Sequence, residues 1–318
     1  MDATARIEIE ARQAGFVPEF QSFWRALPDK AMFGALLAAW VCLFQFFGRA
    51  SGIAGQNASL FGWMWGKWDD PSNDAGHGKL IPFVVLAILW FRRRRLASSV
   101  AGVWWPALAA LGLALALHVV GFLVQQPRLS MVALFSGAWV LAALVWGWEW
   151  GKVSFFPFVI FAFCVPMGGT FAQGLTLPLR LWAAKGTMLL THQLLDMNVT
   201  RAGTQLLDPN GVWSFDVAAA CSGIRSFIAL LAITTVLAGL TMDKMWKKAV
   251  IVGLTIPLAL VCNVMRLTTI ILAANAFQSE AAGRFVDNYF GYVTYGVAVG
   301  CVLLVGRWLK GKPPAVLP

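Results

Sequence analysis

Charged residues are scarce in this sequence, and their scarcity excludes a protein that is soluble in water. Asp, Glu, Lys and Arg make up 13% of the 318 residues, whereas hydrophobic residues make up 59%. A soluble domain carries about 25% charged residues. A chain of this composition cannot cover a surface that faces water, and it is therefore interpreted as an integral membrane protein.

Cysteine and histidine are also few, which limits the kinds of site that the chain can hold. The five cysteines lie in or beside apolar runs, at Cys42, Cys164, Cys221, Cys262 and Cys301. Their odd number and their spacing match no disulfide framework and no metal site. The three histidines lack the spacing of zinc ligands. The formal net charge of +10 does not indicate nucleic-acid binding, because the basic residues are dispersed between apolar runs.

Long apolar runs follow a polar N-terminal segment. Residues 1–30 lack the apolar core and the cleavage site of a signal peptide, and they are interpreted as a cytoplasmic segment. A helix that crosses a bilayer needs roughly 20 apolar residues. Eight runs approach this length, at about 31–48, 78–91, 101–124, 129–148, 154–170, 222–240, 249–274 and 289–309. The sequence thus predicts an all-α polytopic membrane protein, with one transmembrane domain over 31–310 and a cytoplasmic tail over 311–318.

The basic residues orient this predicted bundle. With the N-terminus in the cytoplasm, 15 of the 25 Lys and Arg residues fall in cytoplasmic segments, including Arg92–Arg95. This bias agrees with the positive-inside rule. We therefore expect both termini on the cytoplasmic side of the cell inner (plasma) membrane. The acid-rich loop 69–75 and the segment before the sixth span are expected on the outer, periplasmic side.

Two segments between the fifth and sixth spans differ from the rest. Residues 171–196 mix apolar with polar and charged side chains, which predicts an interfacial or re-entrant helix rather than a span. Residues 197–218 contain two short alternating runs on either side of Pro209-Asn210-Gly211, a pattern typical of a β-hairpin. The hairpin leads directly into the sixth span.

Polar residues in or directly before the last three spans are expected at one membrane depth. A charge near the centre of a span costs at least about 2.5 kcal/mol, so such residues are usually functional or internally paired. Cys221 and Arg225 are four residues apart at the start of the sixth span and share a helix face. Asn263 and Arg266 are three apart in the seventh span, and Asp287 precedes the eighth.

These residue types suit acyl transfer by a thiol. A thiol at a helix N-terminus beside guanidinium groups is partly ionised. A thiolate attacks an amide carbonyl to form a thioester, and fixed guanidinium groups stabilise the thiolate or the oxyanion that develops. A purely structural interpretation is also open, in which Arg225 and Arg266 pair with Asp216 or Asp287 to lock the bundle. Cys262 is expected to point away from the face of Asn263 and to serve packing.

The order of these motifs resembles the exosortase/archaeosortase family. Residues 198–240 contain a short hairpin, then Ala-Ala-Ala-Cys-Ser-Gly-Ile-Arg-Ser and an apolar helix, similar to the family's segment around its nucleophilic cysteine. Asn263-Val264-Met265-Arg266 is similar to the family's downstream Asn-x-x-Arg. Residues 70–82, with His77 followed by Gly78, resemble its histidine-glycine segment. The similarity runs from about residue 60 to 305.

The resemblance implies a membrane-embedded cysteine protease or transpeptidase without cofactor or metal. Its partners would be membrane lipid and secreted proteins with a C-terminal sorting signal, made of a Pro-Glu-Pro-like motif, a transmembrane helix and a basic tail. The enzyme would cleave near the motif and pass the acyl group to a surface acceptor. The expected catalytic residues are Cys221, Arg266 and Asp287, and the expected supporting residues are Arg225, Asn263, His77 and Ser222.

The sequence departs from the family pattern at one position. Exosortases carry a histidine four residues before a glycine at the start of the last span, whereas here Gly291 is preceded at that distance by Asp287. Archaeosortases have an arginine there, and the nearest one here is Arg284. The proton for the leaving amine would then come from Asp287 or from His77, or Asp287 would instead orient Arg266.

Two other functions fit parts of the pattern. A transporter would use the charged residues as a polar path across the membrane, although the absence of visible repeats and the placement of polar groups on one side argue against it. A non-catalytic scaffold for exopolysaccharide assembly would not need the missing histidine. Replacement of Cys221 by alanine distinguishes the transporter from a transpeptidase, because transport should survive it.

Overall fold

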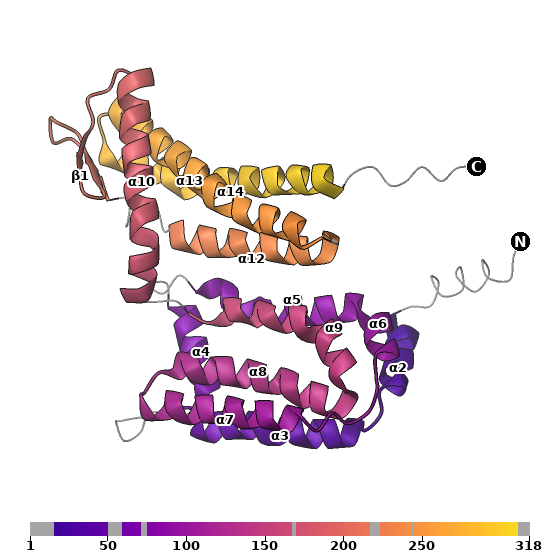
Figure 1. Cartoon of the computed structure of the whole chain (residues 1–318). Helices are drawn as coiled ribbons and strands as arrows, with labels where there is room; N and C mark the ends of the chain where they lie inside the picture. Colours follow the sequence, from indigo (N-terminus) through magenta and orange to yellow (C-terminus); the bar gives the residue numbers. More distant parts are fainter. Residues whose placement is uncertain are drawn as a thin grey trace, which may run out of the picture. The chain divides into compact units, whose positions relative to one another are not determined.

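The computed structural model describes residues 16–49, 59–70, 75–166, 170–216, 223–242 and 244–310 (Figure 1), with the backbone alone for 170–176 and 223–226. The chain forms two compact units, an N-terminal unit with helices α2 to α9 and a C-terminal unit with α10 to α14. Asp70 and His77 belong to the C-terminal unit.

The N-terminal unit consists of helices around α8. Its elements are α2 (Phe16–Ala26), α3 (Lys30–Phe47), α4 (Leu60–Asp69), α5 (Ile81–Phe91), α6 (Arg93–Ser98), α7 (Ala107–Leu123), α8 (Pro127–Trp146), α9 (Trp148–Val159) and the 3-10 helix η3 (Ile160–Cys164). Helix α8 is the most buried because α3, α7 and α9 all pack against it. The 3-10 helix η2 (Gly76–Lys79) contains the point where the chain passes from one unit to the other.

Side chains with both apolar and polar parts join the helices of this unit. Trp40 donates from Nε1 to the carbonyl oxygen of Leu134 at 3.0 Å. Its ring lies so close to Gly137 that a Cβ at that position would come within 2.0 Å of it. The Nδ1 of His118 lies 3.0 Å from the Oγ of Ser130, and both residues are buried. Such pairs satisfy polar atoms that would otherwise be unpaired in an apolar interior.

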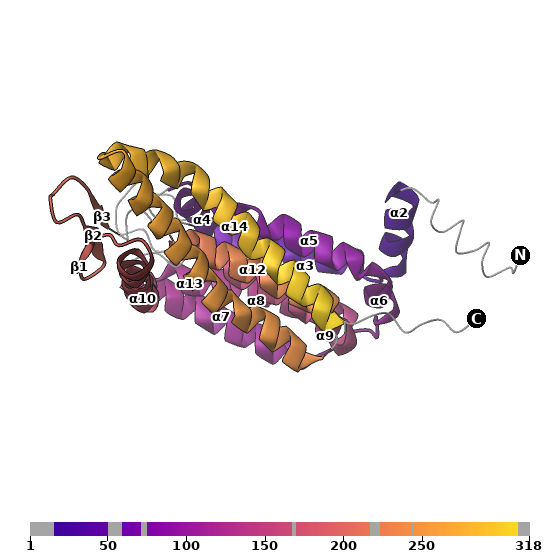
Figure 2. The ribbon, with the colours of Figure 1, turned by 90° about the horizontal axis from the view of Figure 1, so that it is seen from above.

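The C-terminal unit contains three long helices beside one another. These are α12 (Gly223–Thr241), α13 (Met245–Ala276) and α14 (Glu280–Lys310), each of which contacts the other two. Helix α10 (Thr170–Leu194) crosses α13 at a steep angle and is seen nearly end-on in Figure 2. Its 25 residues include Pro178 and cover the semi-polar segment that the sequence assigns to a helix.

A small sheet precedes α12. Its strands β1 (Thr200–Ala202), β2 (Gln205–Leu207) and β3 (Ser214–Asp216) are antiparallel, in the order β1-β2-β3. The predicted hairpin corresponds to β2 and β3, with Gly211 at a φ of 74° in the turn between them. Strand β1 is a third strand that the alternation of the sequence did not predict.

The sheet packs on the end of α13 that is joined to α14. Buried side chains of the two strands nearest α12, Leu206 and Phe215, share one core with α10 and α13. A Cβ at Gly283 in α14 would lie 2.5 Å from the Phe215 ring and 3.1 Å from the carbonyl oxygen of Ile270. The sheet, α13 and the start of α14 are therefore held in close contact directly before the segment that leads to α12.

The described helices fit the all-α membrane class, but they do not confirm eight spans. Four are long and apolar enough to cross a membrane, namely α3, α8, α13 and α14. Three apolar stretches, in α5, α7 and α12, are shorter. The predicted fifth span, 154–170, does not form one continuous α-helix, since α9 ends at Val159 and continues as the 3-10 helix η3.

Candidate functional site

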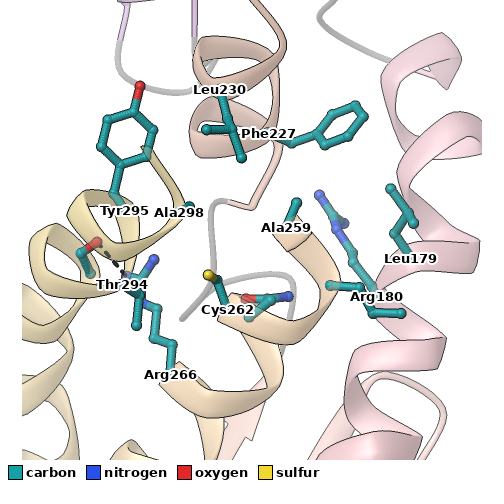
Figure 3. A pocket seen from close by; sticks show the side chains of 13 residues that line it. Leu179, Arg180, Phe227, Leu230, Ala259, Cys262, Arg266, Thr294, Tyr295 and Ala298 are labelled. Atoms are coloured by element: carbon teal, nitrogen blue, oxygen red, sulfur yellow. Dashed lines mark hydrogen bonds between the residues drawn. The ribbon is translucent and has the colours of Figure 1, made fainter. Parts of the chain in front are cut away.

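A cavity of about 70 Å³ lies within the C-terminal unit, between α10, α12, α13 and α14 (Figure 3). Its lining is mostly apolar, and polar groups from three helices converge on it. The lining residues are Leu179, Arg180, Phe227, Leu230, Ala259, Leu260, Cys262, Asn263, Arg266, Gly291, Thr294, Tyr295 and Ala298. An apolar cavity with a few convergent polar groups is the usual form of a small binding site.

Arg266 in α13 forms an ion pair with Asp287 in α14. Its Nε donates to Oδ1 of Asp287 at 2.6 Å, and the two side chains are 14% and 17% exposed. A charge inside an apolar helix needs such a partner. A hydrogen bond between two charged groups is among the stronger ones in proteins. The pair therefore fixes the plane of the guanidinium group beside the cavity.

Gly291 gives the guanidinium group of Arg266 the space that it occupies. A Cβ at position 291 would lie 3.1 Å from Cζ of Arg266 and 3.3 and 3.4 Å from its two terminal nitrogens. Asp287 and Gly291 are four residues apart, so they lie on one face of α14, one turn from each other. The spacing thus places the hydrogen-bond acceptor for Nε, Asp287, and the backbone against which the terminal nitrogens pack, at Gly291, on the same face.

Asn263 and Cys262 line the cavity together with Arg266. The predicted common face of Asn263 and Arg266 is therefore present. The prediction that Cys262 points away from this face is wrong, because its side chain borders the same cavity (Figure 3). Ala259, Cys262, Asn263 and Arg266 have the spacing i, i+3, i+4 and i+7, which forms one continuous stripe on a helix.

Arg180 in α10 is a cavity residue that the sequence did not single out. It reaches into the cavity from the side opposite Arg266 (Figure 3). Its Nε is buried and has no hydrogen-bond partner among the residues that the structure describes. The available signal is an arginine two residues after Pro178, within an otherwise apolar turn, but the semi-polar character of the whole segment favours an interfacial helix.

Several predicted residues cannot be placed in this cavity. Cys221 and Ser222 lie outside the described residues, and of Arg225 only the backbone, in the first turn of α12, is described. Phe227 in the same helix lines the cavity, so the beginning of α12 borders it. His77 lies in η2 and is half-buried within the same unit.

Arg284 is the arginine nearest to Asp287 in the sequence, and it has a partner within its own helix. Its Nε donates to Oε1 of Glu280, one turn earlier in α14, at 3.0 Å, and its side chain is exposed. It is not among the residues that line the cavity. The two acidic residues in the first part of α14 therefore pair with different arginines. Glu280 pairs with Arg284 on the surface, and Asp287 pairs with Arg266 beside the cavity.

Comparison with known proteins identifies one family. The model of the transmembrane exosortase family matches residues 65–304. The matched range contains His77, Cys221, Arg266 and Asp287. No curated protein and no solved structure matches the chain.

Proposed function

Since this chain belongs to the transmembrane exosortase family, a family of multi-pass membrane proteins, we propose that it is a membrane-embedded cysteine transpeptidase. It cleaves the C-terminal sorting signal of secreted proteins through a thioester on Cys221. It then transfers the protein to a surface acceptor. The observation that supports this most directly is the arginine held by Asp287 and Gly291 beside a cavity that the beginning of α12 borders.

Cys221 is the proposed nucleophile, and it precedes α12 by two residues. Its thiolate attacks the carbonyl carbon of the scissile peptide bond, and the carbonyl electrons move to the oxygen. The tetrahedral intermediate collapses when the C–N bond breaks, which leaves a thioester and releases the signal as an amine. The amine of the acceptor, or water, then attacks the thioester and restores the thiolate.

Arg266 is proposed to stabilise the oxyanion of this intermediate. Its orientation is set before substrate binds, because Asp287 holds Nε and Gly291 admits the terminal nitrogens against α14. Donors that are already oriented need no rearrangement as charge develops, and in a site away from water they stabilise the transition state strongly. Asn263 borders the same cavity and is proposed to position the substrate backbone.

Asp287 is proposed to orient Arg266 rather than to supply a proton. Its Oδ1 already accepts the hydrogen bond from Nε of Arg266 at 2.6 Å, so this oxygen is engaged in holding the guanidinium group. His77, which belongs to the same unit, is therefore the proposed acid, with water as the alternative source.

The proposed site lies toward the outer side of the inner (plasma) membrane. Arg266 is ten residues before Ala276, the end of α13, which is about 15 Å along the helix. Lys244, Lys247 and Lys248 lie at the other end of that helix, which the positive-inside rule assigns to the cytoplasm. A nucleophile at this depth would meet the substrate where its signal helix leaves the bilayer.

One observation favours a second candidate function. The family's histidine is replaced by Asp287, which is engaged with Arg266, so the pair also suits a non-catalytic scaffold in which it only joins two helices. The two functions differ in their need for a thiol.

Processing of a secreted reporter that ends in a Pro-Glu-Pro motif, an apolar helix and a basic tail tests the proposal. Cys221→Ala is expected to abolish processing while the protein still inserts in the membrane. Cys301→Ala, a cysteine of α14 that does not line the cavity, is the matched control and should process normally. Processing at the wild-type rate without Cys221 would exclude the cysteine mechanism.

A further inference from the structure

Arg180 has a buried polar atom that the fold does not satisfy. Its Nε is excluded from solvent, and it has no hydrogen-bond partner within the described part of the chain. Buried side-chain donors in proteins are nearly always paired, and each exception requires an explanation. Because the side chain points into the cavity, the missing acceptor is expected to come from a ligand (Figure 3).

The charges around the cavity are unequal. The positive charge of Arg266 is compensated by Asp287, whereas no ion pair of Arg180 is found among the described residues. None of the described lining residues carries a carboxylate, and those other than the two arginines are apolar or neutral. An uncompensated cation in such surroundings is costly. The cavity therefore favours a ligand that brings one negative charge.

We infer that Arg180 binds a carboxylate side chain of the substrate polypeptide close to the scissile bond, and thereby selects the substrate. This inference rests on the proposed function, since it takes the ligand of the cavity to be the substrate. A guanidinium group presents Nε and a terminal nitrogen as a planar fork that matches the two oxygens of a carboxylate. Arg266, the proposed oxyanion donor, borders the same cavity, so the carboxylate would lie near the reacting carbonyl.

The lining of the cavity suits a side chain that carries a carboxylate on methylene groups. Among the described lining residues, the guanidinium group of Arg180 stands beside mostly apolar side chains. Leu179, Phe227 and Leu230 would contact these methylene groups. Selection by charge would follow, because an uncharged isostere leaves the cation uncompensated.

The test measures binding apart from cleavage. Two synthetic peptides carry a Pro-Glu-Pro or a Pro-Gln-Pro motif, then about 20 apolar residues and a basic tail. Binding is measured to the Cys221→Ala protein in phosphatidylcholine vesicles, where no cleavage takes place. We expect the acidic peptide to bind about 10- to 100-fold more tightly than the amide peptide. Arg180→Gln should remove this preference, and Arg180→Lys should keep part of it.

Arg284→Gln is the matched control, since Arg284 is an arginine of the same unit with a partner on the surface. It should leave the preference for the acidic peptide unchanged. Thermal unfolding shows whether each variant is folded. If Arg180→Gln does not fold, the comparison is made with Arg180→Lys, which retains the charge. If the Cys221→Ala protein, in which Arg180 is intact, binds the two peptides equally, the inference is wrong. This outcome does not depend on any variant of Arg180.

The remaining outcomes separate this inference from the proposed function. If the protein with Cys221 cleaves both peptides but Arg180→Gln leaves the ratio of their binding affinities unchanged, the inference is wrong and the proposed function stands. If Arg180 decides binding but the protein with Cys221 does not cleave, the proposed function is wrong, and only the binding of an acidic side chain by Arg180 stands. The binding measurement is repeated in vesicles that also contain phosphatidylglycerol. An effect of Arg180→Gln that follows the content of this anionic lipid instead of the peptide charge would assign Arg180 to a phospholipid and overturn the inference.

Discussion

Arg266 donates from Nε to Oδ1 of Asp287 across the interface of α13 and α14, at 2.6 Å, in a place where neither side chain is as much as one-fifth exposed. Two charges taken out of water are stable only with good geometry and further hydrogen bonds. Loss of either partner would leave an uncompensated charge beside the cavity. The pair therefore has two separable roles, to hold two helices together and to orient a guanidinium group.

Arg266→Lys is expected to lower the rate of reporter processing at least about tenfold. Lysine keeps the charge but lacks the planar group that contacts Asp287 through Nε and lies against Gly291. The rate is measured in membranes that contain equal amounts of each protein. Arg284→Lys, at the exposed pair with Glu280, is the control. Near-normal processing by Arg266→Lys would mean that only the charge is needed.

Gly291→Ala is expected to reduce processing about tenfold or more without unfolding the protein. The new methyl group would lie 3.1 Å from Cζ of Arg266, so the guanidinium group must shift by a few tenths of an ångström. Gly296→Ala in the same helix is the matched control, because a Cβ there meets no atom within 4 Å. Equal processing by the two variants would show that the position of Arg266 against α14 is not important for activity.

The roles of Asp287 and His77 can be separated by their sensitivities. We expect His77→Ala to reduce processing more than Asp287→Asn does, because the amide oxygen of asparagine can still accept from Nε of Arg266. The opposite order would make Asp287 the acid.

A double variant tests the departure from the family pattern. Asp287→His restores the family's residue and supplies an imidazole one turn before Gly291. Combined with His77→Ala, it is expected to recover part of the processing that His77→Ala alone loses. A double variant that is no more active than His77→Ala would show that an imidazole at position 287 cannot replace His77.

Gly283→Ala is expected to destabilise the C-terminal unit by about 1–3 kcal/mol, the usual range for overpacking in a close-packed interior. The added Cβ would lie 2.5 Å from the Phe215 ring and 3.1 Å from a carbonyl oxygen of α13, which cannot move independently of its helix. Thermal unfolding in detergent measures the effect. Gly300→Ala, where a Cβ meets nothing within 4 Å, should unfold at the wild-type temperature or slightly above it.

The predicted topology can be tested by labelling. Single cysteines replacing Thr200 in β1 and Lys244 before α13, both exposed in the structure, are introduced into a protein without its native cysteines. A maleimide that cannot cross the membrane should label position 200 in intact cells and position 244 only after the membrane is opened. Labelling of position 200 from the cytoplasmic side alone would reverse the orientation.

The sequence by itself determined the class of this protein and the family that it resembles. Membrane insertion depends on composition and on the length of apolar runs, which are properties of the chain. The common face of Asn263 and Arg266 followed from helical spacing, since residues three apart on one helix are neighbours in any fold. The turn at Gly211 was predicted for the same reason, because its signal is local.

Only the tertiary structure showed which side chains of different helices lie close together. Arg180 is 86 residues from Arg266 in the sequence, and no periodicity within α10 indicates that both border one cavity. The choice between Asp287 as partner of Arg266 and other pairings depended on how α13 and α14 pack. The need for glycine at position 291 likewise became visible only when the guanidinium group was seen against α14. Contacts between elements depend on packing, which local sequence does not encode.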